Sequence, residues 1–372
     1  MITLENVTKI YHGDVRAVNN VSFTVPEGHV CILVGPSGCG KTTLLKMINR
    51  LIEPTGGRIL IAGRDSSEVN ADQLRRDIGY AIQDIGLFPH LTVAANIAVV
   101  PSLKRFPKDR TRQRVDELLE LVGLDPDEFR DKYPRQLSGG QQQRIGVARA
   151  LGADPPILLM DEPFGAIDPI TRSRLQDEFL KIQEKLRKTI VFVTHDIDEA
   201  LKMGDRIALL KEGELVQYDS PQDLLAHPRN SFVRDFIGAD SSIKRLALMR
   251  VEEVMRVDVP TAKLDHSASE VRALMEQKGL ESIVVVDENN VPRAWLGLSE
   301  LSGQTGRVSD VVSVKPIEDI AVDGSMRVRD ALARMLTTGL SRLSVVDERR
   351  GFKGDITFAA LQRILGDDAG SK

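Results

Sequence analysis

The stretch Gly35-Pro36-Ser37-Gly38-Cys39-Gly40-Lys41-Thr42 has the pattern of a phosphate-binding loop, with its glycines, lysine and hydroxyl residue at fixed spacing. Residues 30–34, directly before it, form a short β-branched apolar run that predicts a buried parallel strand. Residues 43–52, after it, place apolar side chains at helical spacing. In this order of strand, glycine loop and helix, backbone N–H groups and the helix N-terminus surround phosphate oxygens. The stretch therefore predicts an α/β fold with a nucleoside triphosphate at the end of one strand.

Each position of this loop is a candidate contact of ATP. The Lys41 ammonium is expected to reach the β- and γ-phosphates, and the Thr42 hydroxyl is expected to bind Mg²⁺. The expected ATP-binding residues of the loop and the following helix are Gly35, Pro36, Ser37, Gly38, Cys39, Gly40, Lys41, Thr42 and Thr43.

Two further apolar runs end in polar residues and predict neighbouring strands. Residues 156–163 end in Asp161, expected to hold Mg²⁺ through water, and Glu162, expected to accept a proton from the attacking water or orient it. Residues 189–194 lead into His195, which can donate a hydrogen bond to the γ-phosphate. Glu162 and His195 are thus the candidate catalytic residues. Because ligands of α/β sheets bind at the carboxyl ends of strands, we expect these side chains to gather at one edge.

The motif Leu137-Ser138-Gly139-Gly140-Gln141 resembles the L-S-G-G-Q signature of ATP-binding cassette (ABC) ATPases. The resemblance extends over residues 1–236 and implies a P-loop NTPase with a RecA-like core and a helical subdomain. It also implies that the chain hydrolyses ATP only as a pair with a second copy of itself, because each signature completes the site of the other subunit. Most such pairs drive a membrane transporter.

The same resemblance assigns roles to residues that are uninformative alone. Tyr11 matches the aromatic residue that stacks on adenine, with a core tyrosine at a strand end as the alternative. Gln83 matches the glutamine that reaches Mg²⁺ and the attacking water. The residues expected to serve the partner's ATP or to communicate across the pair are Ser138, Gly139, Gly140 and Asp168.

The pattern becomes helical between Gln83 and the signature. Residues 112–122 place apolar side chains at the i, i+3, i+4 and i+7 positions of a helix. The region from about 88 to 150 resembles the helical subdomain that couples an ABC ATPase to its membrane partner. We therefore expect integral membrane permease subunits as partners, and a peripheral location on the cytoplasmic face of the inner (plasma) membrane.

The bulk composition fits a cytoplasmic protein of several domains. The 372 residues include 50 Lys+Arg and 54 Asp+Glu, and the net charge of −4 gives no general attraction to nucleic acid, which is not expected as a partner. The two cysteines, Cys31 and Cys39, are expected to be reduced thiols. The chain opens without a basic-then-apolar leader, and no apolar stretch approaches the roughly 18 residues that span a bilayer. Any pore is therefore expected to come from other chains.

The last third of the chain repeats with a period of 60 residues. Met275-x-x-x-Gly279 aligns with Met335-x-x-x-Gly339, and each is followed by a β-branched run that ends in Val-Asp-Glu. The repeat resembles a tandem pair of CBS (cystathionine β-synthase) modules, an α+β pair that often binds adenine nucleotides. The expected boundaries are an ATP-binding domain at 1–236, a linker at 237–249, and CBS copies at 250–305 and 309–368.

The CBS copies depart from the usual ribose-binding pattern [ST]-x-x-D. In the second copy Ala360 stands where the aspartate is expected after Thr357, and the first copy has Gly297 and Glu300 at the aligned positions. Three roles for the pair stay open: binding of a nucleotide, including a cyclic dinucleotide, sensing of ionic strength, and dimerisation. Trp295, the only tryptophan, is expected in the core of the first copy.

The order of ABC ATPase and CBS pair resembles the ATP-binding subunits of importers of quaternary amines (glycine betaine, carnitine and choline), and residues 78–90 are also close to that family. A cage for such a cation needs clustered aromatic side chains, but only 4% of the residues are aromatic. Substrate choice is therefore expected to lie in the permease and an extracytoplasmic solute-binding protein. An importer of another solute and a soluble ABC ATPase without a transport role are the alternatives.

Overall fold

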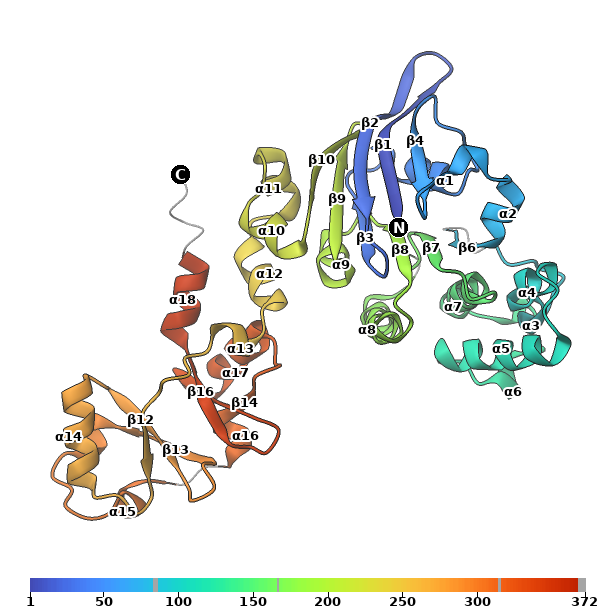
Figure 1. Cartoon of the computed structure of the whole chain (residues 1–372). Coiled ribbons are helices and arrows are strands. Elements are labelled where there is room, and N and C mark those ends of the chain that lie inside the picture. Colours follow the sequence, from blue (N-terminus) through green and yellow to red (C-terminus); the bar gives the residue numbers. More distant parts are fainter. Residues whose placement is uncertain (83–85, 166, 314–315, 367–372) are drawn as a thin grey trace. The chain divides into compact units, whose positions relative to one another are not determined.

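The computed structural model describes residues 1–82, 86–165, 167–313 and 316–366. It divides the chain into two compact units, Met1–Gly238 and Ala239–Lys372 (Figure 1). Gln83, one of the expected Mg²⁺ ligands, lies outside the described residues. Within the described ranges, no helix is both long enough and apolar enough to cross a membrane.

The first unit is built on a six-stranded sheet in which one edge strand is antiparallel to its neighbour and the other five strands run parallel to one another. In order across the sheet, the strands are β10 (Glu214–Asp219), β9 (Arg206–Lys211), β3 (Val30–Val34), β8 (Thr189–Val193), β7 (Ile157–Asp161) and β6 (Ile78–Ala81). Every residue of β3, β7 and β8 is buried, which is the pattern of a parallel sheet covered on both faces. The three strands predicted for the site are therefore present and adjacent.

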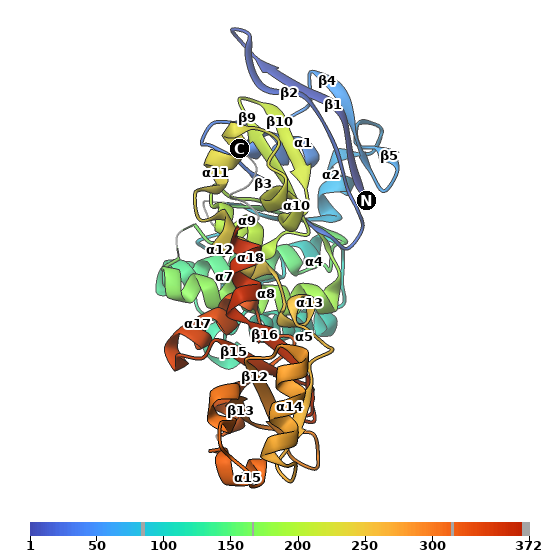
Figure 2. The same ribbon diagram turned by 90° about the vertical axis from the view of Figure 1, so that its left-hand side faces the viewer.

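A second, antiparallel sheet lies on the other side of helix α1 (Lys41–Ile48) (Figure 2). Its strands, in order, are β2 (Val15–Val25), β1 (Ile2–Tyr11), β4 (Gly56–Ile61) and β5 (Arg64–Asp65). The apolar side chains of α1 pack with residues of both sheets in one core. The sequence predicted this helix to residue 52, but it ends at Ile48 because the next residue, Asn49, is its C-cap and Arg50 adopts a left-handed φ of 49°.

The helical subdomain lies along the edge strand β6, against which α7 packs (Figure 1). Its helices are α3 (Val93–Ile97), α4 (Val99–Leu103), α5 (Lys108–Leu121), α6 (Pro126–Phe129) and α7 (Gly139–Leu151). The helix predicted at 112–122 is α5, which begins earlier and buries Val115, Leu118 and Leu119. The other helices of the first unit are α2 (Ala71–Arg76), α8 (Pro169–Leu186), α9 (Ile197–Met203), α10 (Pro221–Ala226) and α11 (Ser231–Ile237).

The second unit contains two copies of one fold, each with a three-stranded sheet whose strand register is the same after a shift of 60 residues. The first copy consists of α13 (Val251–Val254), β11 (Thr261–Lys263), α14 (Ala268–Lys278), β12 (Ser282–Val286), β13 (Pro292–Gly297) and α15 (Val308–Val311). The second consists of α16 (Ile317–Ile320), β14 (Ala321–Asp323), α17 (Val328–Thr338), β15 (Arg342–Val346), β16 (Phe352–Thr357) and α18 (Phe358–Gly366).

Each copy has its own apolar core, and a helix from before the repeat joins the second one. Helix α12 (Ser241–Leu248) packs on α17 and α18, and its Leu246 is buried in the core of the second copy. Part of the segment expected as a linker is thus a helix of the second unit.

The expected position of Trp295 in the core of the first copy is wrong. Strand β13 alternates between its faces, and Ala294 and Leu296, rather than Trp295, pack into that core. The indole ring instead faces the Arg342 guanidinium of the second copy, 5.0 Å from the ring centroid. Its Nε1 is buried without a hydrogen-bond partner in the described part of the chain.

Candidate active site

The phosphate loop contains two positions that only glycine can occupy without a steric clash. Gly35 has a φ of +149°, and a Cβ atom there would collide with the Leu210 carbonyl. Gly40 has a φ of +101°, and a Cβ atom there would collide with the Ala17 carbonyl. These two glycines let the loop turn tightly between β3 and the N-terminus of α1, so that α1 begins at Lys41.

The side chain of Lys41 is folded into the loop. It is only 6% exposed, and its Nζ donates hydrogen bonds to the carbonyl oxygens of Gly35 at 2.7 Å and Pro36 at 2.9 Å. Cys39 Sγ lies 3.8 Å from the same ammonium. Burial raises the pKa of the Cys39 thiol, although the nearby Lys41 charge opposes the shift, so burial disfavours the thiolate.

Two hard oxygen donors meet at the end of β7. The Thr42 hydroxyl donates to Asp161 Oδ1 at 3.1 Å. Burial raises the pKa of Asp161, and the neighbouring Glu162 charge adds to the shift, whereas the Thr42 hydrogen bond opposes it. A bound cation would relieve this cost by stabilising the carboxylate, and a hydroxyl and a carboxylate are ligands that suit Mg²⁺. The residues present therefore fit the metal that the motif implies.

Glu162 and His195 come together from two neighbouring strands. His195 Nδ1 lies 3.3 Å from Glu162 Oε1, and the imidazole is largely exposed. The Glu162 N–H donates to the Val193 carbonyl at 3.0 Å, which ties the residue after β7 to the end of β8. Glu162 has a left-handed φ of 45°, a conformation that costs a non-glycine residue free energy and is concentrated at functional sites.

The expected partner-facing residues occupy helix N-termini. Ser138 is the N-cap of α7, where its hydroxyl accepts from Gln141 N–H, and the Gln141 side chain accepts from Ser138 N–H at 2.9 Å. Apart from their chain neighbours and the backbone of α7 itself, no described atom lies within 4 Å of a Cβ built on Gly139 or Gly140, so this turn is open. Asp168 is the N-cap of α8, and its hydrogen bond from the backbone N–H of Thr171 lowers its pKa.

Tyr11 lies at the end of β1 and is 40% exposed, so the alternative of a core tyrosine is wrong. The Lys9 ammonium lies 5.4 Å from its ring centroid. The remaining face of the ring is the kind of surface on which a base can stack.

The sequence prediction missed the side chains of Gln142 and Gln143, which follow the signature. Gln142 Nε2 donates to the carbonyls of Pro134 at 2.9 Å and Leu137 at 3.2 Å, and Gln143 Nε2 donates to the carbonyl of Glu162 at 3.4 Å. The run of three glutamines at the start of a predicted helix was the available signal, but its contacts lie in loops that the sequence does not place.

In the second unit, the positions aligned with the ribose-binding pattern make local caps. The Thr357 hydroxyl accepts from the backbone N–H of Ala360 at 3.2 Å, and the Glu300 carboxylate accepts from Gly297 N–H at 2.6 Å. A fully buried carboxylate lies outside these positions, on Asp355 of β16.

The phosphate loop, the acidic strand end and the exposed signature turn on one chain define an ATPase of the ABC class. The family model for the ABC transporter matches residues 18–165, and the model for the CBS domain matches residues 251–301 and 308–367. The dimeric post-hydrolysis structure of the ATP-binding cassette MJ0796, bound to ADP and Pi, is similar with a TM-score of 0.55 and 38% identity, and the match covers 59% of this chain and 99% of that one.

Relatives that match this chain over nearly its full length show which family of ABC proteins it belongs to. The glycine betaine/carnitine/choline transport ATP-binding protein OpuCA of Bacillus subtilis is 46% identical over 99% of this chain and 97% of its own length. The choline transport ATP-binding protein OpuBA of the same organism is 48% identical with the same coverage, and the osmoprotectant import ATP-binding protein OsmV of Salmonella typhimurium is 46% identical over 96% of this chain and 94% of its own length. The chain belongs to this family of ABC importer ATP-binding proteins with C-terminal CBS domains, and it is an ATPase.

Proposed function

We propose that this chain supplies the ATP hydrolysis that drives an importer of quaternary amines such as glycine betaine, carnitine and choline. The observation that carries the proposal is the meeting of Thr42, Asp161, Glu162 and His195 at the carboxyl edge of one sheet. The names of the full-length relatives supply the substrate class.

Within the site, each side chain has a distinct role. The loop of Gly35 to Thr43 surrounds the phosphates, with Lys41 leaving its carbonyl partners to reach the β- and γ-phosphates, and Tyr11 stacks on adenine. Thr42 and Asp161, together with Gln83, would hold Mg²⁺, which would supply positive charge to neutralise the phosphates. Glu162 orients the attacking water and accepts its proton, while His195 donates to the γ-phosphate. The short His195–Glu162 distance supports a shared role at the reacting phosphate.

The site is completed by a second copy of the chain. Ser138, Gly139 and Gly140 lie on an open helix N-terminus, which suits a phosphate of another subunit. Asp168, at the N-terminus of α8, communicates across the pair. The similarity to a dimeric cassette supports this arrangement.

The other partners follow from the family. Integral permease subunits supply the path through the membrane, and an extracytoplasmic solute-binding protein delivers the solute, so the chain is peripheral on the cytoplasmic face. The CBS pair, a regulatory tail, responds to a nucleotide or to ionic strength. A nucleotide would bind without the usual aspartate, because Ala360 occupies that position.

Uptake by the reconstituted transporter tests the substrate. The chain is assembled with its permease and binding protein in vesicles that contain ATP, and uptake of labelled glycine betaine, choline and carnitine is compared with that of an uncharged amino acid. Saturable uptake of a quaternary amine, lost with Lys41→Ala, is the expected result. Uptake of the amino acid alone would favour the alternative, an importer of another solute.

A further inference from the structure

Glu162 is held by its backbone as well as by its side chain. Its N–H donates to the Val193 carbonyl at 3.0 Å, and its own carbonyl accepts from Gly165 N–H at 3.1 Å. The third bond comes from Gln143 Nε2 at 3.4 Å. Because Glu162 has a left-handed φ of 45°, its carboxylate position depends on these contacts. Of the three, only the Gln143 bond comes from the helical subdomain.

Gln143 lies on α7, the helix that begins at the signature. The side chain is 7% exposed, so its amide group is withdrawn from water and the bond to Glu162 is not replaced by solvent at low cost. Gln143 lies five positions after Ser138, which corresponds to about 7.5 Å of helix. The signature turn is fixed to the same helix by the capping box of Ser138 and Gln141 and by the two hydrogen bonds of Gln142.

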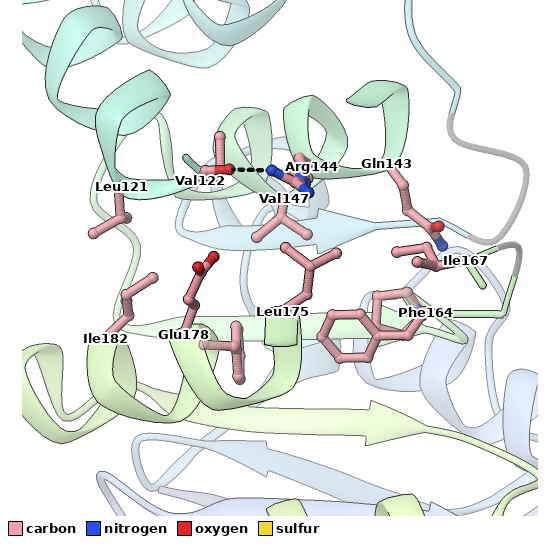
Figure 3. A pocket seen from close by; sticks show the side chains of 12 residues that line it. Leu121, Val122, Gln143, Arg144, Val147, Phe164, Ile167, Leu175, Glu178 and Ile182 are labelled. Carbon is pink, nitrogen blue, oxygen red and sulfur yellow. Dashed lines mark hydrogen bonds between the residues drawn. The ribbon is translucent and has the colours of Figure 1, made fainter. Parts of the chain in front are cut away.

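A small pocket of about 40 Å³ lies between this part of α7 and α8, and Figure 3 shows Val147 and Leu175 facing each other across it. Gln143 lies at the end of the pocket near Ile167, and Arg144 donates to the Val122 carbonyl at 3.4 Å. A pocket of this size leaves the two helices in close contact, and a close-packed interior transmits strain, so a displacement at one end of α7 is carried along the helix to Gln143. The Gln143 hydrogen bond is then the contact by which a shift of α7 reaches Glu162.

We propose that Gln143 is a positioning residue that couples the two ATP sites of the pair. ATP of the partner subunit is bound by Ser138 and the N-terminus of α7, and α7 transmits that binding through Gln143 to the backbone of Glu162, which acts on the chain's own ATP. The inference rests on the proposed function, because it requires the signature to face the partner's nucleotide. It gives each site a direct response to the occupancy of the other.

The test is the dependence of steady-state ATPase rate on ATP concentration, measured with the full chain in the assembled transporter. Gln143→Met keeps the length of the side chain and removes the donor. We expect kcat to fall about 10-fold through misplacement of Glu162, with KM nearly unchanged and the Hill coefficient reduced toward 1. Gln183→Met is the matched control, because Gln183 is also buried and donates to the backbone carbonyls of Gly28 and Lys188 at 3.2 and 2.5 Å.

A second variant keeps the test decisive if Gln143→Met folds poorly. Gln143→Glu has nearly the same shape, and its buried carboxyl group can donate to the Glu162 carbonyl only when protonated. The rate of this variant relative to the original chain should therefore rise as the pH is lowered from about 8.5 to 6.5. Gln183→Glu should show no such rise in relative rate.

The outcomes separate this inference from the proposed function. If Ser138→Arg leaves hydrolysis intact, the paired site itself is wrong. If Ser138→Arg stops hydrolysis but Gln143→Met keeps the original kcat and Hill coefficient, or if Gln183→Met changes both to the same extent, the coupling role of Gln143 is overturned.

Discussion

The ATP site and the CBS pair show two ways in which a sequence pattern relates to chemistry. In the first unit, the strand ends of β7 and β8 bring Asp161, Glu162 and His195 to one edge, where they contact each other or the phosphate loop. In the second unit, the two copies share one backbone register, but equivalent positions carry different side chains, such as Trp295 and Asp355. A repeated fold therefore predicts the backbone of the second unit well and its chemistry poorly.

The asymmetry of the CBS pair is concentrated around Asp355. Its buried carboxylate accepts from Arg256 Nε at 2.8 Å and Nη2 at 2.6 Å, and Arg342 lies 3.7 Å away while it faces the Trp295 ring. The backbones of Arg256 and Asp355 also exchange two hydrogen bonds, of 2.8 and 3.0 Å. The first copy has Trp295 and Ser282 where the second has Asp355 and Arg342, so this charge cluster exists once. It links the segment after α13, the first copy and the second.

The largest expected effect is a loss of ATP turnover when a catalytic residue of the first unit is replaced. Glu162→Gln should keep ATP binding and lower turnover by about 10²–10⁴-fold, because the water loses its proton acceptor. Turnover is measured by phosphate release and binding with a fluorescent ATP analogue, and the exposed Glu184→Gln on α8 is the control. Turnover equal to that of the control would remove Glu162 from its role.

A smaller effect, confined to the second unit, tests the charge cluster. Asp355→Asn should lower the local stability of β15 and β16 by about 2 kcal/mol, because the two hydrogen bonds from Arg256 and the ion pair with Arg342 lose their charged partner. Hydrogen exchange of the full chain measures this, with Asp287→Asn as control, since that carboxylate is paired with Arg293 but is partly exposed.

ATPase activity under one fixed condition should be unchanged in Asp355→Asn, because none of the proposed ATP contacts lies in the second unit. Equal exchange in the Asp355 and Asp287 variants would show that the cluster does not stabilise this unit.

The smallest expected change in turnover comes from removing the second unit, which tests whether catalysis belongs to the first unit and regulation to the second. A chain that ends at Gly238 retains the whole first unit and should hydrolyse ATP within about twofold of the full rate. In the reconstituted transporter it should lose the response of uptake to salt or nucleotide. Salt titration between about 0.1 and 1 M covers the range in which the Debye length falls from about 10 Å to 3 Å. An unchanged response in the truncated transporter would exclude the tail as regulator.

Much of the ATP site could be predicted because its residues have fixed spacing and lie at strand ends. The burial of β3, β7 and β8 follows from continuous apolar runs, and Lys41 and Thr42 follow from the glycine loop. The contact of Gln143 with Glu162 could not be predicted, because it joins helix α7 to the residue after β7, and their relative position depends on how α7 packs. Trp295 was misplaced for a related reason: its residue type favours a core, but the alternation of β13 turns it to the other copy.

The central claim, that each ATP is bound between two copies of the chain, is tested most directly by mixing two inactive variants. Lys41→Ala removes the chain's own phosphate contact, and Ser138→Arg blocks the contact to the partner's ATP. A mixed pair has one site intact on both sides, so random pairing should restore up to about a quarter of the original turnover although each variant alone is inactive. If mixed pairs form, as shown by differently tagged chains, and no turnover returns, the shared site is contradicted.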